Sequence, residues 1–264
     1  GTYDDGHGGT YTADTVTILA TDGGTYQYQW TADYLDAGDP VGISFSAEGE
    51  VVLKRLSSTG LSGKVSEDGT ELGSLSFASG AEILDVTGSS AVKIFSSRLA
   101  GLNLTRDMVT YYSLNGSGEI NRLILEDATG DAGQYGVLTR METLGEGMSA
   151  AYSYEYDLNG TSYTLPATTT RYPVSVGAIR ITGDPADPDR LLPLTQERAD
   201  SIHGSVLRSG SRSYTIADQV VVYEYRDRQY FLSTLDRVQE QGLSLTGWYD
   251  RPESEGGRMR VIVA

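Results

Sequence analysis

The sequence predicts an all-β protein made of tandem small modules, and three observations carry this prediction. The 264-residue chain contains 18 tyrosines, and threonine and serine are abundant. It also contains 32 glycines. Tyrosine and threonine suit a half-exposed pleated strand, and glycine supplies the positive-φ turns between short strands. A pattern of short strands recurs along the chain at regular spacing, which is typical of an array of similar modules.

The recurring pattern ends in a strand that a glycine opens, at Gly49, Gly118 and Gly257. The steps are 118 − 49 = 69 and 257 − 118 = 139, and the second is close to twice the first. A further copy should therefore place its last strand near residue 187, where residues 187–194 read as a polar turn and an apolar strand. We expect four repeats, the first truncated or degenerate and the third the most diverged: residues 1–60, 61–128, 129–198 and 199–264.

The elements of the first repeat follow from its turn residues. Asp22-Gly23-Gly24 is a turn between two alternating stretches, so it predicts a hairpin. Residues 1–10 show no periodicity and are expected to be frayed. The expected elements are a hairpin of residues 15–20 with 25–30, one helical turn over 34–38, and a hairpin of 40–47 with 50–56.

The other repeats keep this order. Short connectors carry the helical pattern, with Leu235 and Val238 three residues apart and Ser233 placed to cap them. The expected elements are, in the second repeat, a strand at 93–95, a helical or 3-10 connector at 97–104 and a turn at 115–118; in the third, strands at 135–138, 148–157 and 162–165; and in the fourth, a strand at 230–232, a connector at 233–241 and a turn at 250–257. Prolines should confine parts of the third repeat to sheet edges or loops, at positions 166, 173, 185, 188 and 193.

Each repeat therefore reads as three strands, a one-turn connector and two further strands. Five short strands with a helical turn before the fourth are typical of a small SH3-like or OB-like β-barrel. The linkers at 126–133 and 196–200 are short and polar. Neighbouring barrels should then be nearly in contact and share buried surface.

Composition excludes several classes of function. The chain has no cysteine, so it forms no disulfide, thiolate nucleophile or cysteine zinc site. Its net charge of −16 and pI near 4.4 oppose binding to nucleic acid or to an anionic membrane. No apolar stretch approaches the roughly 18 residues that a membrane-spanning helix needs.

Sequence signatures of catalysis are largely absent. The chain has no nucleophile elbow, dinucleotide-binding or phosphate-binding loop, or His-Glu-x-x-His motif. His203 lies near Asp200 and Ser205, but a triad needs a geometry that closeness in sequence does not provide, so a structural or exposed histidine is expected. Two carboxylates drawn from four acidic residues of the third repeat could in principle act as a glycosidase pair, although a solvated strand edge is the simpler interpretation. The four residues are Glu142, Glu146, Glu155 and Asp157.

Acidic turns raise the question of calcium. Oxygen ligands from carboxylates and carbonyls suit this ion, but neither candidate turn has the spacing of an EF-hand. The two candidate sets are Asp184, Asp187 and Asp189 in one turn, and Asp127 and Asp131 in another. The N-terminal Asp4-Asp5-Gly6-His7 segment is a weaker candidate for metal capture. An ordinary charged turn is the favoured interpretation throughout.

Aromatic side chains allow a sugar-stacking surface. Strand alternation should direct Tyr152, Tyr154 and Tyr156 to one side, where they form either a recognition surface or barrel core. Trp248 stands at a position equivalent to Phe45 and Ser113 and is expected in the core. The remaining aromatic candidates are Trp30, Tyr26, Tyr28, Tyr111, Tyr112, Tyr223 and Tyr225.

Two segments resemble a known family. Residues 123–137, with Leu-Glu-Asp-Ala-Thr-Gly-Asp and a following Tyr-Gly-Val, resemble a linker in large surface proteins of Gram-positive anaerobes that carry S-layer homology domains. Residues 245–250 and 257–263 resemble the C-terminal end of such proteins. The resemblance covers residues 61–264 and, more loosely, the first repeat. It implies a secreted protein held at the cell wall, although no S-layer homology motif occurs in this chain.

The sequence thus predicts a non-catalytic structural, spacer or interaction region of an extracellular, cell-wall-associated surface protein. No catalytic, cofactor-binding or metal-binding residue is assigned, and no cofactor is expected. The expected partners are neighbouring repeats of the same protein and a wall or host glycan or protein. A glycan- or host-binding adhesin module that uses exposed tyrosines is the first alternative, and a carboxylate-based glycan hydrolase is the second.

Overall fold

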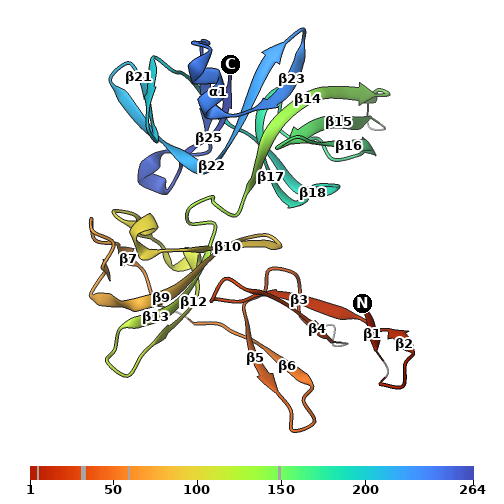
Figure 1. Cartoon of the computed structure of the whole chain (residues 1–264), viewed down its shortest axis with the longest axis vertical. Coiled ribbons are helices and arrows are strands. Elements are labelled where there is room, and N and C mark those ends of the chain that lie inside the picture. Colours follow the sequence, from red (N-terminus) through yellow and green to blue (C-terminus); the bar gives the residue numbers. More distant parts are fainter. Residues whose placement is uncertain (5, 31–33, 59, 148–149) are drawn as a thin grey trace. The chain divides into compact units, whose positions relative to one another are not determined.

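The computed structural model describes residues 1–4, 6–30, 34–58, 60–147 and 150–264. About 57% of the chain is strand and about 7% is helix, so the predicted all-β class is confirmed. The chain divides into an N-terminal unit, Gly1–Ala132, and a C-terminal unit, Gly133–Ala264. In each unit the larger sheets curl like half-barrels (Figure 1). Closed five-stranded barrels are not confirmed, and the division into four repeats stays a prediction.

The N-terminal unit contains short hairpins followed by longer strands. Its elements are β1 (Thr2–Asp4), β2 (Thr10–Thr12), β3 (Thr15–Leu19), β4 (Thr25–Gln29), β5 (Val41–Phe45), β6 (Val51–Arg55), β7 (Gly63–Lys64), β8 (Glu71–Leu72), β9 (Leu75–Thr87), β10 (Ser90–Ile94), the 3-10 helix η1 (Ser96–Leu99), β11 (Asn103–Leu104), the 3-10 helix η2 (Arg106–Met108), β12 (Val109–Leu114) and β13 (Ile120–Glu126).

The C-terminal unit contains two larger sheets and one short α-helix. Its elements are β14 (Gln134–Leu144), β15 (Ala151–Leu158), β16 (Thr161–Thr168), β17 (Gly177–Asp184), β18 (Asp187–Pro193), β19 (Thr195–Arg198), β20 (Ser201–His203), β21 (Val206–Ser209), β22 (Arg212–Arg226), β23 (Gln229–Ser233), α1 (Leu235–Glu240), β24 (Thr246–Tyr249), the 3-10 helix η4 (Glu253–Glu255) and β25 (Met259–Val263).

A mixed sheet forms the centre of the N-terminal unit, in the order β10-β9-β13-β12. Only β9 and β13 run parallel, and the other pairs are antiparallel. Successive residues Ile83 and Leu84 of β9 enter two different apolar clusters because strand side chains alternate between faces. Apolar residues therefore follow one another along this strand, as expected where both faces of a parallel pair are covered.

The C-terminal unit contains the same arrangement, in the order β23-β22-β25-β24, again with one parallel pair. The register is also the same. Ile120 pairs with Phe77, and Met259 pairs with Ile216. Both residues of the second pair therefore stand 139 positions after those of the first (259 − 120 = 139 and 216 − 77 = 139). The 139-residue step between Gly118 and Gly257 is therefore a true structural repeat of residues 75–126 in residues 214–263.

The predicted helical connectors are confirmed at equivalent positions. Leu99 of η1 and Val238 of α1 are both fully buried and are 139 residues apart (238 − 99 = 139). The cap of α1 is Thr234, whose hydroxyl accepts the Arg237 N–H at 3.4 Å. The expected cap, Ser233, is wrong, because its hydroxyl donates instead to Glu224 at 2.9 Å.

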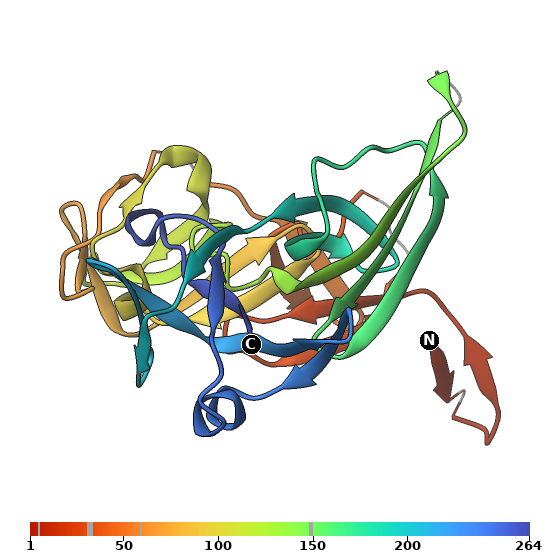
Figure 2. The same ribbon diagram turned by 90° about the horizontal axis from the view of Figure 1, so that it is seen from above.

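A second sheet of the C-terminal unit has the order β16-β15-β14-β17-β18 and curls around its own apolar cluster (Figures 1 and 2). All its pairs are antiparallel, so residues 134–193 do not repeat the mixed sheet. The expected strand near residue 187 is present as β18. The proline prediction is confirmed: Pro166, Pro188 and Pro193 lie in the edge strands β16 and β18, and Pro173 and Pro185 lie in loops.

In the N-terminal unit, both expected hairpins are present as β3–β4 and β5–β6. Two other expectations are wrong. Residues 2–4 are not frayed, because β1 pairs with β2 through Tyr3 and Tyr11. Residues 34–38 form a turn rather than a helical turn, since the residue before Pro40 is disfavoured in the helical region and Asp39 accepts the Asp36 N–H at 2.8 Å.

Candidate functional site

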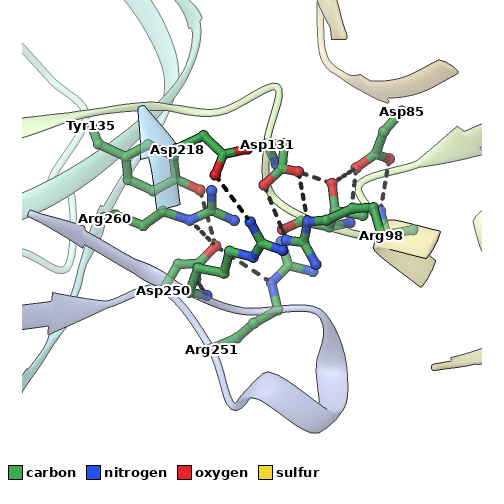
Figure 3. A network of polar contacts seen from close by, with 11 residues as sticks. Asp85, Arg98, Asp131, Tyr135, Asp218, Asp250, Arg251 and Arg260 are labelled. Atoms are coloured by element: carbon green, nitrogen blue, oxygen red, sulfur yellow. Dashed lines mark hydrogen bonds and ion pairs between the residues drawn. The ribbon is translucent and has the colours of Figure 1, made fainter. Parts of the chain in front are cut away.

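Buried polar side chains are where a site would first be sought. Six are buried within the described residues: Asp85, Thr87, Thr129, Arg180, Glu224 and Arg260. Figure 3 shows Asp85 and Arg260 in polar networks. Three networks involve them or the carboxylates that the sequence singled out. Their geometry decides between a chemical and a structural role.

Asp85 anchors the segment that follows β13. Its carboxylate accepts the N–H of Ala128 at 2.9 Å, the N–H of Thr129 at 2.8 Å and the Thr129 hydroxyl at 2.5 Å. Burial raises the pKa of Asp85 above its ordinary value, although these three donors oppose the shift. These three hydrogen bonds all come from one loop of the same unit, so the carboxylate holds that loop in place.

Arg98 of η1 binds the same loop. Its Nε and one terminal nitrogen donate to the two carboxylate oxygens of Asp131 at 2.8 and 3.1 Å, and it also donates to the Thr129 carbonyl at 3.1 Å. This paired geometry is the strong form of an arginine–carboxylate contact. Asp131, one of the candidate calcium ligands, is therefore bound by an arginine, while Asp127 accepts the Thr87 hydroxyl at 3.2 Å.

The positions equivalent to Asp85 and Arg98 also carry an acidic and a basic residue in the C-terminal unit. Glu224 stands 139 residues after Asp85, and Arg237 stands 139 residues after Arg98 (224 − 85 = 237 − 98 = 139). Arg237 Nε donates to Glu224 at 2.7 Å. Hydrogen bonds from Ser233 and Arg237 hold the pKa of Glu224 below its ordinary value, the Ser233 bond contributing most. The longer glutamate reaches its arginine directly, whereas Asp85 reaches the loop instead.

Asp250 organises the second network, in the C-terminal unit. Its carboxylate forms an ion pair with Arg260, whose Nε lies 3.1 Å away, and accepts the Tyr135 hydroxyl at 3.0 Å and the Arg258 N–H at 2.9 Å. The side chains of Asp250 and Arg260 are only 1% and 4% exposed. The Arg260 guanidinium also lies 4.9 Å from the centre of the Tyr135 ring, close enough for a cation–π contact. Burial raises the pKa of Tyr135, so this hydroxyl keeps its proton and donates.

Tyr223 joins the two sheets of the C-terminal unit in the third network. Its hydroxyl donates to Asp157 Oδ1 at 2.7 Å and accepts the Asn159 N–H at 3.1 Å. Burial, and then the contact with Asp157, raise the pKa of Tyr223 above its ordinary value. Asp157, one of the four candidate glycosidase carboxylates, is thereby used to hold β22 against the β15–β16 turn.

The other candidate carboxylates show no catalytic arrangement. Glu142 and Glu155 both contact Arg140, at 2.5 and 3.4 Å, and Glu146 is exposed. His203 is exposed at the end of β20, and Asp200 accepts the Gly210 N–H at 2.6 Å instead of orienting the histidine. His203 is thus exposed, which is one of the two outcomes expected from the sequence.

The acidic turn of the third predicted repeat is an ordinary turn. Asp184 faces Asp187 across the β17–β18 connection and accepts the Ala186 N–H at 2.8 Å. Asp5 of the N-terminal candidate lies outside the described residues, and His7 is exposed. Within the residues that the structure describes, no group of three or more acidic or histidine side chains is placed to hold a metal ion.

The tyrosine series of β15 is core, so the recognition surface considered for it is wrong. Tyr154 and Tyr156 are 0% and 1% exposed and belong to the cluster inside the curled β14–β18 sheet, with Tyr152 packed against it. Burial raises the pKa of Tyr156 to about 12. Trp248 packs half-buried against a second cluster, and its pairing with Val261 confirms its equivalence to Ser113.

Sequence reasoning missed a cleft in the N-terminal unit. It has a volume of about 570 Å³, and β3, β5 and the mixed sheet all line it. Its lining is mostly apolar: Val16, Ile18, Leu19, Trp30, Leu35, Pro40, Val41, Leu53, Leu84, Val86, Ala91 and Ile124. A neighbouring cleft of about 490 Å³ is lined by Tyr28, Trp30 and the β5–β6 turn. The apolar residues of the hairpins that contain β3 and β5 were the feature of the sequence that could have indicated this cleft, because two short hairpins cannot bury them alone.

Comparisons with known proteins found no matching family model, no matching curated protein and no matching solved structure. In the part of the chain that the structure describes, none of the helices has the length and apolar character to cross a bilayer.

The Asp250 network predicts a specific loss of stability. Replacing Asp250→Asn should lower the free energy of unfolding by about 3 kcal/mol, because it leaves the buried Arg260 charge without its carboxylate. Asp218→Asn is the matched control, since Asp218 is 95% exposed and 3.9 Å from Arg258, and it should change stability by less than about 0.5 kcal/mol. Urea unfolding followed by circular dichroism measures both, and equal effects would contradict the network's structural role.

The Tyr223 contact predicts a pH dependence in the alkaline range. The folded pKa of Tyr223 lies above the ordinary 10.0, so its contribution to stability is complete below about pH 10 and is lost as the pH rises further. The stability difference between wild type and Tyr223→Phe, about 1–3 kcal/mol at neutral pH, should therefore shrink above about pH 10. The exposed Tyr225→Phe is the control. Denaturant unfolding across this range tests the sign, and a difference that grows with pH would refute it.

Proposed function

We propose that this chain is a non-catalytic structural or interaction region of a secreted, cell-wall-associated surface protein. In this proposal its curled sheets derive from tandem five-stranded SH3-like or OB-like modules, four in number. The stiff modules space or present other parts of the protein, and their partners are neighbouring repeats and a wall or host glycan or protein.

One observation carries the proposal: the mixed sheet occurs twice with the same register. Residues 75–126 and 214–263 share strand order, one parallel pair and a buried apolar residue in the connector. Duplicated modules are typical of proteins whose surfaces serve to stack and to extend.

The use of the buried charges supports the same proposal. Asp85, Asp157 and Asp250 each bind groups of their own unit and hold loops or sheets together. A catalytic carboxylate must instead reach a substrate from a cleft. The cleft of the N-terminal unit is lined mostly by apolar residues. Asp36 and Asp39 also line it, but the Asp39 carboxylate is bound by Arg55 at 2.5 Å, so the lining suits packing rather than chemistry.

The cell-surface address rests on the sequence resemblance. The resembling segments correspond to the β13–β14 connection and to β24–β25. The net charge of −16 supports an environment without nucleic acid or anionic lipid as partner.

Single-molecule force spectroscopy on the whole chain tests the structural role. Each unit is half of the chain, so two unfolding steps are expected, each releasing roughly 40 nm at about 3.5 Å per residue. Leu99→Ala should weaken one step and Val238→Ala the other, because each removes a fully buried connector residue from one unit. Smooth extension at low force, without steps, would count against a load-bearing spacer.

Glycan binding is a second candidate, at Tyr28 and Trp30, which the sequence analysis included among the aromatic candidates. The cleft of about 490 Å³ combines the aromatic rings of Tyr28 and Trp30 with the carboxylates of Glu48 and Glu50. Aromatic faces and acidic hydrogen-bond acceptors together suit a sugar. Wild type should bind members of a wall-glycan array, and Trp30→Ala should lose at least tenfold in affinity while Trp248→Phe retains it. An array without hits would dismiss this candidate.

A further inference from the structure

Two Asn-Gly pairs occur in turns of this chain, at Asn115-Gly116 and Asn159-Gly160. In this dipeptide the glycine nitrogen can attack the asparagine carboxamide, because glycine has no side chain to hinder the approach. A hydroxyl residue follows each pair, Ser117 in one and Thr161 in the other. The local sequences are therefore closely matched, and a difference in reactivity between the two pairs has to come from the fold.

Hydrogen bonds fix the carboxamide of Asn115. Its Oδ1 accepts the N–H groups of Ser117 at 2.9 Å and Glu119 at 3.0 Å, and its Nδ2 donates to the Glu119 carboxylate at 2.8 Å. Side-chain bonds of this kind to the nearby main chain are typical of asparagine in a turn. Attack on Asn115 would have to break these bonds, so this pair is protected in the folded chain.

The carboxamide of Asn159 is not fixed in this way. Asn159 is exposed at the tip of the β15–β16 hairpin, and within the described residues its side chain makes no hydrogen bond. Leu158 pairs with Thr161, so Asn159 and Gly160 form a two-residue turn. Their φ angles of 51° and 88° are those of a type I′ turn. The main chain of this turn is thus well defined, while the reactive carboxamide is unrestrained.

A carboxylate accepts the proton that this attack must remove. Gly160 N–H donates to Asp157 Oδ1 at 2.8 Å, which is within the distance at which a general base takes a proton. The same oxygen accepts the Tyr223 hydroxyl at 2.7 Å, so Asp157 is held in place beside the attacking nitrogen. In the part of the chain that the structure describes, no carboxylate accepts the Gly116 N–H.

We propose that Asn159-Gly160 is a self-modification site, at which Asp157 acts as general base and the turn converts to isoaspartate. The Gly160 nitrogen gives its proton to Asp157 and forms a bond to Asn159 Cγ, which closes a succinimide ring. The Cγ–Nδ2 bond breaks, and the carboxamide nitrogen leaves with that proton as ammonia. Water then opens the ring at one of its two C–N bonds, which gives isoaspartate or aspartate at position 159. This inference stands whether or not the chain acts as a spacer.

The conversion weakens the joint between the two sheets of the C-terminal unit. In the succinimide the Gly160 nitrogen carries no hydrogen, so its bond to Asp157 is lost. Isoaspartate then adds a methylene group to the main chain of a turn that has only two residues. The Asn159 N–H, which donates to the Tyr223 hydroxyl at 3.1 Å, has to move as a result. The site therefore limits the time for which this joint keeps its full strength.

Peptide mapping by mass spectrometry of the full chain, stored at neutral pH, tests the proposal. In the folded chain Asn159 should convert at least tenfold faster than Asn115, and electron-based fragmentation should identify isoaspartate among the products. In guanidinium chloride the two rates should become similar, because the unfolded chain retains only the matched local sequences. Similar rates in the folded chain, or a difference that persists in denaturant, would overturn the proposal.

Two variants separate base catalysis from simple loosening of the turn. Asp157→Asn removes the base and should slow conversion of Asn159 at least tenfold, without change at Asn115. Tyr223→Phe leaves the carboxylate on the Gly160 N–H while it loosens the joint, so it should retain the rate or raise it. Conversion that is unchanged or faster in Asp157→Asn would mean that the contact is only structural, and it would overturn the proposal.

The pH profile of wild type keeps the test valid if Asp157→Asn fails to fold. Catalysis by a carboxylate does not need hydroxide, so the rate at Asn159 should rise less steeply with pH than the rate at Asn115, and equal slopes overturn the proposal. Asn159→Asp is the control for the consequence, since it adds the same charge without a longer main chain. Stored wild type should unfold at a lower denaturant concentration than this variant, and equal midpoints would refute the weakened joint. None of these results depends on the unfolding steps in the force experiment.

Discussion

The parallel pairing of two strands, β9 with β13 and β22 with β25, is the constraint on which each unit depends. A parallel pair cannot be closed by a tight turn, so the chain must cross over between the two strands. In both units the crossover includes one antiparallel strand, then a short helical connector and later another antiparallel strand; β11 and η2 also lie in the first crossover and η4 in the second. The connector must therefore pack on the sheet, and this explains why Leu99 and Val238 are fully buried at equivalent positions.

Acidic and basic side chains reinforce the same crossover. The acid at 85 or 224 lies on the first parallel strand, and the arginine at 98 or 237 lies in the connector. In one unit they meet through the loop at Thr129, and in the other they meet directly. Asp85 and Glu224, which stand at equivalent positions, differ by one methylene group. Burial outweighs the donors of Asp85 and raises its pKa, while the hydrogen bond from Ser233 is the largest influence on Glu224 and lowers its pKa.

Local features of this fold were predictable from the sequence because they depend on local chemistry. Turn residues predicted the hairpins β3–β4 and β5–β6, and prolines marked the edge strands β16 and β18. The 139-residue step predicted the relation between residues 75–126 and 214–263. Strand order was not predictable in the same way, since it depends on pairing between distant segments, and residues 134–193 adopt a wholly antiparallel order that their spacing did not distinguish.

The site was harder to predict than the fold, for a related reason. Alternation placed Tyr154 and Tyr156 on one side of a strand but did not say which side was covered, and the curled sheet encloses them. Carboxylates such as Asp131 and Asp157 resembled ligands or catalysts until their arginine and tyrosine partners from distant segments were known.

Open strand edges are a liability, and the composition of this chain limits it. An unpaired edge beside exposed apolar residues such as Ile43 and Phe45 favours pairing with any available strand, including one from another copy. A net charge of −16 makes copies of this chain repel one another.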